Sequence, residues 1–220
     1  MKLLSPPAAS PAVSATRRDR HRGEGEADES RPITDRVKES LFNVLYKYDL
    51  PTRKVVADLF SGVGSLGLEA LSRGASFATF VEKDPKVITI LNKNIEKTGF
   101  VKESKVIRAN AFKIGAPVDP VRKEGRFSNG VDERKYDLIF VDPPYSATRD
   151  VGGGSPLDGL LNVLSEQSAP DGIVIVRTNR RTELLEQYGR FEIIERRQWG
   201  SMAVTILQPR NPVRDAARGP

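Results

Sequence analysis

Asp142-Pro143-Pro144-Tyr145 combines a carboxylate, two rigid residues and an aromatic ring in consecutive positions. The stretch follows residues 136–141, a short apolar run that predicts a buried strand. Two prolines cannot continue that strand, because proline donates no backbone N–H and fixes φ. One interpretation is a proline-terminated strand with a tyrosine in a turn. The other is an acceptor site for a planar base: Asp142 and the Pro143 carbonyl could orient an amino nitrogen, and Tyr145 could contact the ring. We favour the second interpretation, because ligands of open α/β sheets bind at the carboxyl ends of the strands.

A glycine pattern, Gly62-x-Gly64-x-x-Gly67, lies between a predicted strand at 55–60 and a predicted helix at 65–72. Glycines in such a loop let the backbone turn sharply and approach a ligand closely. The pattern predicts a nucleotide-type cofactor, but NAD and S-adenosyl-L-methionine both fit it.

Glu82 ends the next predicted strand, where a carboxylate can accept hydrogen bonds from both ribose hydroxyls of either cofactor. Three other features choose between the two cofactors. Asp58 precedes the loop, where its charge would repel a pyrophosphate but could hold the ammonium group of a methionine moiety. Asn110 follows the third predicted strand, where its amide could read an adenine edge or simply occupy a turn. The single histidine, His21, lies in a polar segment, so a hydride reaction would lack its usual proton-transfer partner. We therefore favour S-adenosyl-L-methionine.

Strand and helix patterns alternate along the chain, which indicates a mostly parallel α/β sheet with helices on both faces. A closing hairpin adds one antiparallel strand, and residues 113–135 read as a loop. We predict strands at 55–60, 77–82, 105–109, 136–141, 172–177, 190–197 and 202–208, and helices at 34–48, 65–72, 85–98, 157–164 and 182–187.

Length and composition favour one domain, at 31–208, between a disordered extension at 1–30 and a disordered tail at 209–220. The chain has 220 residues, of which 38% are hydrophobic, and no cysteine, which excludes disulfides and thiolate metal sites. No apolar run approaches the roughly 20 residues that span a bilayer. The net charge of +6 suits a polyanionic partner.

From about 31 to 207 the sequence resembles the class I S-adenosyl-L-methionine-dependent methyltransferases, which have a Rossmann-like fold. More closely it is similar to the RsmD-type methyltransferases, which act on guanine N2 of small-subunit ribosomal RNA. The stretches that carry the resemblance are 31–43, which begins Arg-Pro-Ile-Thr-Asp-Arg, then 58–70 and 142–145.

The resemblance implies a seven-stranded sheet and methyl transfer to the exocyclic N2 of a guanine in the loop of helix 31. It implies an acceptor site at Asp142, Pro143, Pro144 and Tyr145, bordered by Thr34 and Arg36. The residues that we expect around the cofactor are Asp58, Phe60, Ser61, Gly62, Gly64, Glu82, Lys83, Asn110 and Ala111. Arg31, Thr34, Arg36 and Arg149 are the expected RNA contacts, whereas we expect Arg177 to be solvated. The sequence departs from the family before Arg31 and in the long loop at 113–135, and both departures bear on RNA docking.

We expect the partner to be small-subunit ribosomal RNA or a partly assembled small subunit, with no metal, no membrane and a monomeric protein. The expected location is the bacterial cytoplasm, or a plastid or other organelle if the N-terminus is a transit peptide. Alternatives that keep the fold are an adenine-N6 methyltransferase of DNA or RNA and a protein glutamine methyltransferase. A non-catalytic RNA-binding relative and an NAD oxidoreductase are further alternatives.

Overall fold

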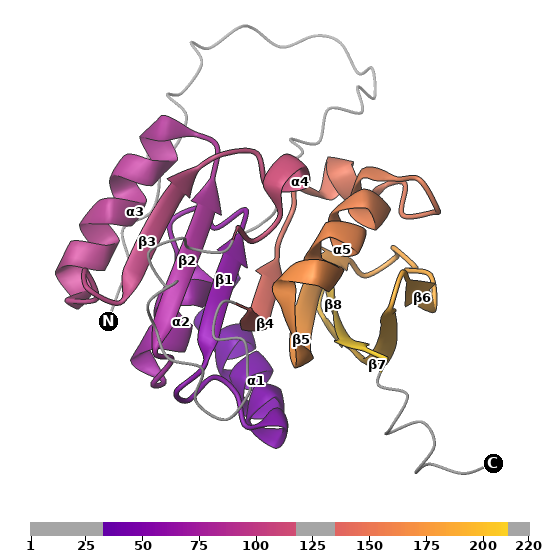
Figure 1. Cartoon of the computed structure of the whole chain (residues 1–220), viewed down its shortest axis with the longest axis horizontal. Coiled ribbons are helices and arrows are strands. Elements are labelled where there is room, and N and C mark those ends of the chain that lie inside the picture. Colours follow the sequence, from indigo (N-terminus) through magenta and orange to yellow (C-terminus); the bar gives the residue numbers. More distant parts are fainter. Residues whose placement is uncertain (1–32, 118–134, 211–220) are drawn as a thin grey trace, which may run out of the picture.

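The computed structural model describes residues 33–117 and 135–210, which form one sheet flanked by helices (Figure 1). The strands of the described residues follow the order β3-β2-β1-β4-β5-β8-β7-β6. The five strands from β3 to β5 pair in parallel, whereas β5–β8, β8–β7 and β7–β6 pair antiparallel. The strands are β1 Val55–Leu59, β2 Phe77–Glu82, β3 Ser104–Arg108, β4 Tyr136–Val141, β5 Ser168–Asn179, β6 Gln187–Tyr188, β7 Phe191–Trp199 and β8 Met202–Pro209.

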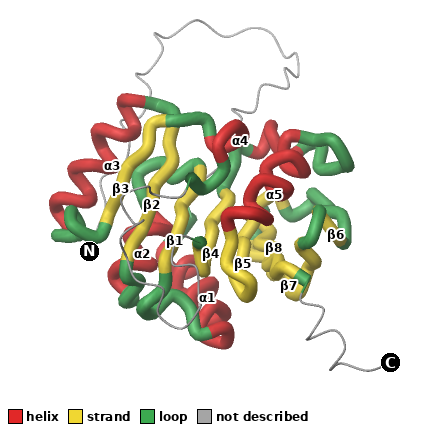
Figure 2. The backbone as a smooth tube through the Cα atoms, in the orientation of Figure 1, coloured by secondary structure: helices red, strands yellow, loops and turns green. Residues whose placement is uncertain are grey.

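Helices cover both faces of the sheet, as parallel crossovers require (Figure 2). One apolar core includes residues of α1, α2 and α3, and the other includes residues of α4 and α5. Along β4, Phe140 belongs to the first core and Val141 to the second, which explains the unbroken apolar run of this strand. The helices are α1 Asp35–Leu45, α2 Ser65–Ser72, α3 Pro85–Thr98, α4 Ala111–Ile114 and α5 Pro156–Gln167, with 3₁₀ turns η1 Tyr46–Tyr48 and η3 Tyr145–Thr148.

The ends of α1 and α3 follow from side chains that satisfy free backbone groups. Thr34 caps α1 by accepting a hydrogen bond from the Val37 N–H at 3.4 Å. Asp84 caps α3 by accepting from the Lys86 N–H at 2.8 Å, and Gly99 ends α3 with a φ of 80°. The predicted helix at 34–48 continues after Leu45 only as the 3₁₀ turn η1.

The predicted fold class is confirmed, with two corrections on its antiparallel side. The predicted helix at 182–187 is wrong, because this segment is irregular, with a bend at Glu186, and leads into β6. Its geometry depends on buried Tyr188, whose hydroxyl accepts from the Leu185 N–H at 3.1 Å and donates to the Val151 carbonyl at 2.6 Å. The short strand β6 raises the strand number from the expected seven to eight.

Two predicted irregular segments also begin later than expected. The predicted loop at 113–135 begins inside α4, and β8 includes Pro209, which pairs with Phe191, so the tail cannot start there. The extension at 1–30, the middle of the loop at 118–134 and the end of the tail at 211–220 lie outside the described residues. Across 33–117 and 135–210, no helix has both the length and the apolar character needed to cross a membrane.

Candidate active site

A cavity of about 270 Å³ opens where the carboxyl ends of β1, β2, β3 and β4 meet. Small-molecule sites range upward from about 300 Å³, so the cavity lies near the lower end of that range. Eight of the predicted site residues line it: Phe60, Gly62, Glu82, Lys83, Asn110, Ala111, Asp142 and Pro144. Four residues that were not predicted, Val81, Val87, Ala109 and Phe112, complete an apolar wall.

The glycine loop depends on backbone conformations that side chains rarely allow. Gly62 and Gly64 have φ values of 53° and 86°. A Cβ atom on Gly64 would lie 2.5 Å from Leu91 Cδ1, so only glycine lets the loop pack against α3. Phe60 also has a positive φ, of 59°, and its ring lies 4.7 Å from the Phe112 ring, centroid to centroid. The loop therefore turns tightly at the floor of the cavity.

Glu82 is held by backbone donors from two directions. Its Oε2 accepts from the Gly62 N–H at 3.0 Å, and its Oε1 accepts from the N–H groups of Lys83 and Asp84 at 2.8 and 3.0 Å. A carboxylate offers about four acceptor sites, two on each oxygen, so Oε1 is fully used and Oε2 keeps one site for a ligand. The carboxylate thus joins the glycine loop to the end of β2 and stays available at the cavity wall.

Asp58 is almost completely buried and does not line the cavity. Its Oδ2 accepts from the Gly67 N–H at 2.8 Å, at the start of α2. Burial raises the pKa of Asp58 well above its usual value, and the charges of Asp142 and Glu82 raise it further against the opposing effects of the Gly67 bond and Arg177. The predicted contact between Asp58 and the cofactor ammonium therefore stays a prediction.

Asn110 has the two roles that the sequence left open. Its Oδ1 accepts from the Phe112 N–H at 3.0 Å and caps α4, while the residue also lines the cavity. Ser61 is buried beside the glycine loop, and its hydroxyl has no hydrogen-bond partner among the described residues. A buried hydroxyl without a partner is unusual, which makes Ser61 a candidate ligand contact.

Asp142 is paired with Arg177, a contact that the sequence interpretation missed. Arg177 Nε donates to Asp142 Oδ1 at 2.5 Å, and the side chain of Arg177 is only 4% exposed. Burial raises the pKa of Asp142 to about 6, even though the charge and the hydrogen bond of Arg177 lower it. Arg177 Nη1 is buried and has no partner in the part of the chain that the structure describes.

The expectation that Arg177 is solvated is therefore wrong. In the pairing of β4 with β5, Val141 lies opposite Val176, so Asp142 and Arg177 follow at the same level. Arg177 also shares a face of β5 with Ile173 and Ile175, which belong to the first core. The alternation of side chains along β5 is the sequence signal that could have identified it.

The other predicted acceptor and RNA residues that the structure describes do not line the cavity. Pro143 is buried, and Tyr145 begins η3 with its hydroxyl buried and without a partner among the described residues. Arg149 is exposed just after η3, and Arg31 lies outside the described residues.

Thr34 and Arg36 are exposed at the start of α1. Lys38 Nζ lies 3.5 Å from Glu69 Oε2, and farther along both helices Arg73 Nη1 donates to Tyr46 Oη at 3.0 Å. The two contacts show that α1 and α2 run in the same direction. Because α2 begins at the glycine loop, α1 also begins on that side of the sheet.

No cluster of three or more His, Cys, Asp or Glu side chains suited to a metal ion occurs in residues 33–117 and 135–210. The site instead combines two carboxylates at the ends of β2 and β4, a glycine loop and an apolar wall. This arrangement can hold a nucleoside and, next to it, a hydrogen-bond donor of a second reactant.

Comparison with known proteins decides the family. The family described as "Conserved hypothetical protein 95" matches residues 13–208. This chain belongs to that family. A relative from Bacillus subtilis (strain 168), "Putative rRNA methyltransferase YlbH", is 31% identical over 183 residues, which are 82% of this chain and 89% of that protein. "Ribosomal RNA small subunit methyltransferase D" of Escherichia coli (strain K12) is 38% identical over 117 residues, about half of each chain at 52% and 50%.

A solved structure titled "Putative methyltransferase yhhF from Escherichia coli" has a TM-score of 0.61 and 28% identity, over 83% of this chain and 89% of that one. The predictions of the RsmD-type family and of a class I methyltransferase fold are thereby confirmed. The predicted cofactor, S-adenosyl-L-methionine, is confirmed with the family.

Proposed function

We propose that this protein transfers the methyl group of S-adenosyl-L-methionine to the exocyclic N2 of a guanine in small-subunit ribosomal RNA. The loop of helix 31 is the target that the family resemblance implies. One observation carries the proposal: a single cavity is lined by Glu82 and Asn110 at one side and by Asp142 and Pro144 at the other. The binding site of a nucleoside cofactor and the site of an acceptor nitrogen would therefore be continuous.

The cavity residues fit the cofactor chemically. Glu82 Oε2 keeps an acceptor site for a ribose hydroxyl, and Val81, Val87 and Phe112 offer an apolar wall for a planar base. The unpartnered hydroxyl of Ser61 could donate to a polar group of the ligand. Once bound, S-adenosyl-L-methionine supplies an already activated methyl group, so the protein has mainly to position the acceptor. Such positioning is worth roughly 7–11 kcal/mol of the barrier.

Asp142 is the residue that we assign to the acceptor nitrogen. With a pKa of about 6, its carboxylate is mostly ionised at pH 7 and can accept an N–H bond from an amino group. The bond orients the nitrogen lone pair, and the Pro143 carbonyl can accept the second N–H. Transfer would form a nitrogen–carbon bond as the sulfur–methyl bond of the cofactor breaks, with S-adenosyl-L-homocysteine as the leaving group. The nitrogen would then lose one proton to Asp142 or to water.

The target base must leave its stack before it can reach Asp142, at a cost of a few kcal/mol. Stacking on Tyr145 could recover about 1–3 kcal/mol. Tyr145 does not line the cavity, so this contact requires the ring to turn from its present position.

The test is incubation of the protein with radiolabelled S-adenosyl-L-methionine and small subunits that lack the modification, followed by mapping of the labelled nucleotide. We expect label on guanine N2 of the small-subunit RNA. Label on adenine N6, or on protein, would overturn the assignment of the acceptor and leave the methyltransferase class intact.

A further inference from the structure

Four exposed arginines lie along the edge of the sheet that carries the candidate active site, outside its cavity. They are Arg149, which follows η3, Arg180 and Arg181, which follow β5, and Arg196 in β7. We name this group the arginine rim. Its residues come from three separate elements and therefore form a surface rather than a run in the sequence.

The arginine rim lies close to the acceptor residue Asp142. Arg177 contacts Asp142, and Arg180 follows three residues later, which corresponds to about 10 Å of extended chain. On the other side, Arg149 comes four residues after Tyr145. Thr182 Oγ1 donates to the Thr148 carbonyl at 3.5 Å and so joins the segment after β5 to η3. The two parts of the rim therefore adjoin each other next to the acceptor site.

The segment that carries Arg180 and Arg181 is already ordered by hydrogen bonds. Arg196 Nη2 donates to the carbonyls of Arg180 and Thr182, at 2.9 Å each. The Arg180 N–H donates to the Ser201 carbonyl at 2.9 Å, joining the segment to the turn between β7 and β8. A surface that is ordered before its ligand binds loses less conformational entropy on binding.

The charges of the arginine rim are not neutralised by the described residues around it. Arg149, Arg180 and Arg181 make no ion pair within 33–117 and 135–210, whereas Arg197, next to Arg196, is paired with Glu195. Asp150, Glu183 and Glu195 are the acids within two residues of these arginines in sequence, and Glu195 is paired with Arg197. With that pair counted as neutral, the four cations of the rim and the two remaining anions leave a net positive edge.

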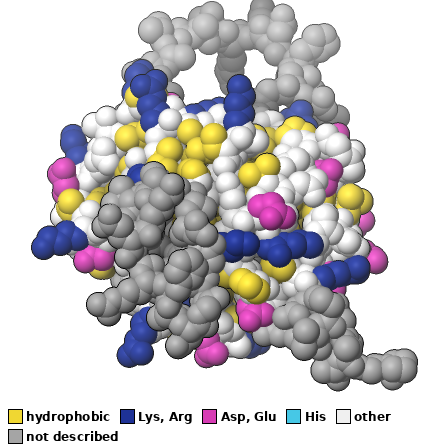
Figure 3. All heavy atoms as spheres, in the orientation of Figure 1, with side chains coloured by type: hydrophobic (Ala, Val, Ile, Leu, Met, Phe, Trp, Pro, Cys, Tyr) yellow, Lys and Arg dark blue, Asp and Glu magenta, His cyan; other side chains and the backbone are white. Residues whose placement is uncertain are grey.

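Net charge alone would not have identified this surface. On the face shown in Figure 3, basic and acidic side chains are interspersed, although the whole chain carries a charge of +6. What distinguishes the arginine rim is its position beside Asp142 and its ordered backbone. Arginine also suits phosphate, because its planar guanidinium donates two parallel hydrogen bonds.

We propose that the arginine rim binds the RNA phosphates that flank the target nucleotide. A base that leaves its stack to reach Asp142 brings its own backbone to this edge, where neighbouring phosphates meet the arginines. The inference rests on the proposed function for the identity of the ligand. The rim would hold the RNA strand in register without reading its sequence.

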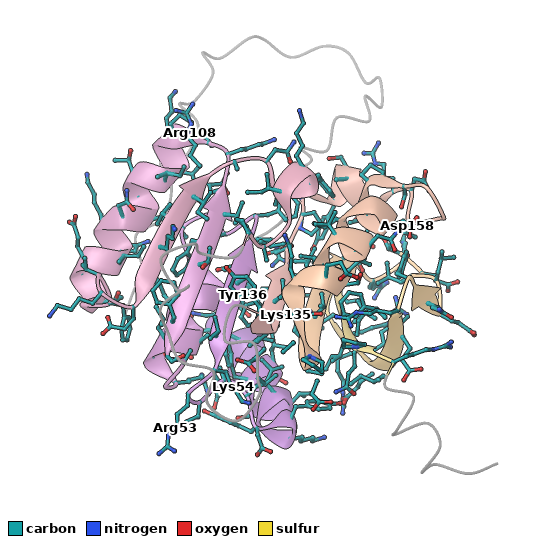
Figure 4. The ribbon with its side chains drawn as sticks, viewed as in Figure 1. Arg53, Lys54, Arg108, Lys135, Tyr136 and Asp158 are labelled. Atoms are coloured by element: carbon teal, nitrogen blue, oxygen red, sulfur yellow. The ribbon has the colours of Figure 1, made fainter. Side chains whose placement is uncertain are left out.

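The experiment compares two double variants that lose the same charge. Arg180→Gln with Arg181→Gln removes two rim cations but keeps the backbone carbonyl that Arg196 binds. Arg53→Gln with Lys102→Gln is the control, because both side chains are exposed and precede β1 and β3 at the opposite edge. Figure 4 shows Arg53 at the lower end of the sheet and Arg108, the last residue of β3, at the upper end. Each protein is titrated with a fluorescent single-stranded fragment of small-subunit RNA at several salt concentrations.

We expect the rim variant to bind RNA roughly tenfold more weakly than the wild type. The slope of the logarithm of the binding constant against the logarithm of the salt concentration should become about 1.4 less steep, because each lost phosphate contact contributes ~0.7. Affinity for S-adenosyl-L-methionine and the rate at saturating RNA should not change. A rim variant that binds RNA as well as the control variant would overturn the proposal. The readout separates the two proposals: if RNA binding depends on the rim but no guanine is methylated, only the proposed acceptor fails.

Discussion

The two halves of the candidate active site are stabilised in different ways. In the cofactor half, Glu82 and Asn110 accept hydrogen bonds from backbone N–H groups at most 20 residues away in sequence. In the acceptor half, Asp142 depends on Arg177, which is 35 residues away and belongs to the next strand. Local backbone geometry thus fixes one half, and tertiary packing fixes the other.

The halves also differ in how completely their polar groups are satisfied. In the cofactor half both oxygens of Glu82 have donors, and Ser61 Oγ is buried without a partner among the described residues. The acceptor half has two such groups, Tyr145 Oη and Arg177 Nη1. Unpartnered buried groups cost free energy unless a ligand or a movement provides partners. In the cofactor half a bound ligand could provide a partner for Ser61, whereas the two groups of the acceptor half include the Tyr145 hydroxyl, whose ring must turn to reach the base.

Asp142→Ala is the substitution with the largest expected effect on this contrast. We expect the methyl-transfer rate to fall about 10²–10⁴-fold, because the amine loses the carboxylate that orients it. The dissociation constant of S-adenosyl-L-methionine, measured by calorimetry, should change little, since the donors and acceptors of the cofactor half are intact.

Asp142→Asn is the matched variant, because its amide oxygen can still accept from Arg177 and so preserves the packing. It should be about as inactive as the alanine variant. Normal turnover in both variants would remove Asp142 from the mechanism.

Arg177→Met should have the next largest effect. The variant leaves the Asp142 carboxylate without its partner. Breaking a buried ion pair lowers the free energy of unfolding by about 3–5 kcal/mol. We expect a smaller loss here, because the side chain of Asp142 is 18% exposed. A misplaced carboxylate should lower the turnover rate up to roughly a hundredfold. The KM for S-adenosyl-L-methionine should stay the same.

The pH profile separates a positioning role of Arg177 from a merely structural one. In the wild type the rate should rise with pH through about 6, as Asp142 ionises. Arg177 lowers the pKa of Asp142, so Arg177→Met should move this limb to higher pH, and Arg177→Lys should restore part of the shift. The charged groups that face Asp142 are Arg177 and Asp58. A pH–rate limb that stays near 6 in Arg177→Met would contradict the positioning role of Arg177.

This contrast also explains what the sequence could predict. Caps, glycine turns and strand ends depend on neighbouring residues, so the limits of α2, α3, β2 and β4 and eight residues of the cavity wall were predicted. The Asp142–Arg177 pair depends on which strand lies beside β4, and the irregular segment at 182–187 depends on the burial of Tyr188. Such tertiary contacts override local pattern, which indicated a solvated arginine and a helix.

Glu82→Gln should have the smallest effect and is confined to the cofactor half. The glutamine amide has one acceptor oxygen, which would face the two N–H groups of Lys83 and Asp84 and turn the NH₂ group toward the Gly62 N–H. The glutamine NH₂ group and the Gly62 N–H, both donors, would then face each other at the glycine loop. The acceptor site that Glu82 Oε2 offers to the ribose would be lost. We expect S-adenosyl-L-methionine to bind about tenfold more weakly by calorimetry, a difference of about 1.4 kcal/mol. RNA affinity and the pH limb near 6 should not change, because Arg177 and the arginine rim are untouched. If Glu82→Gln instead weakened RNA binding and left cofactor binding normal, the two halves of the site would not be independent, which would contradict the contrast between them.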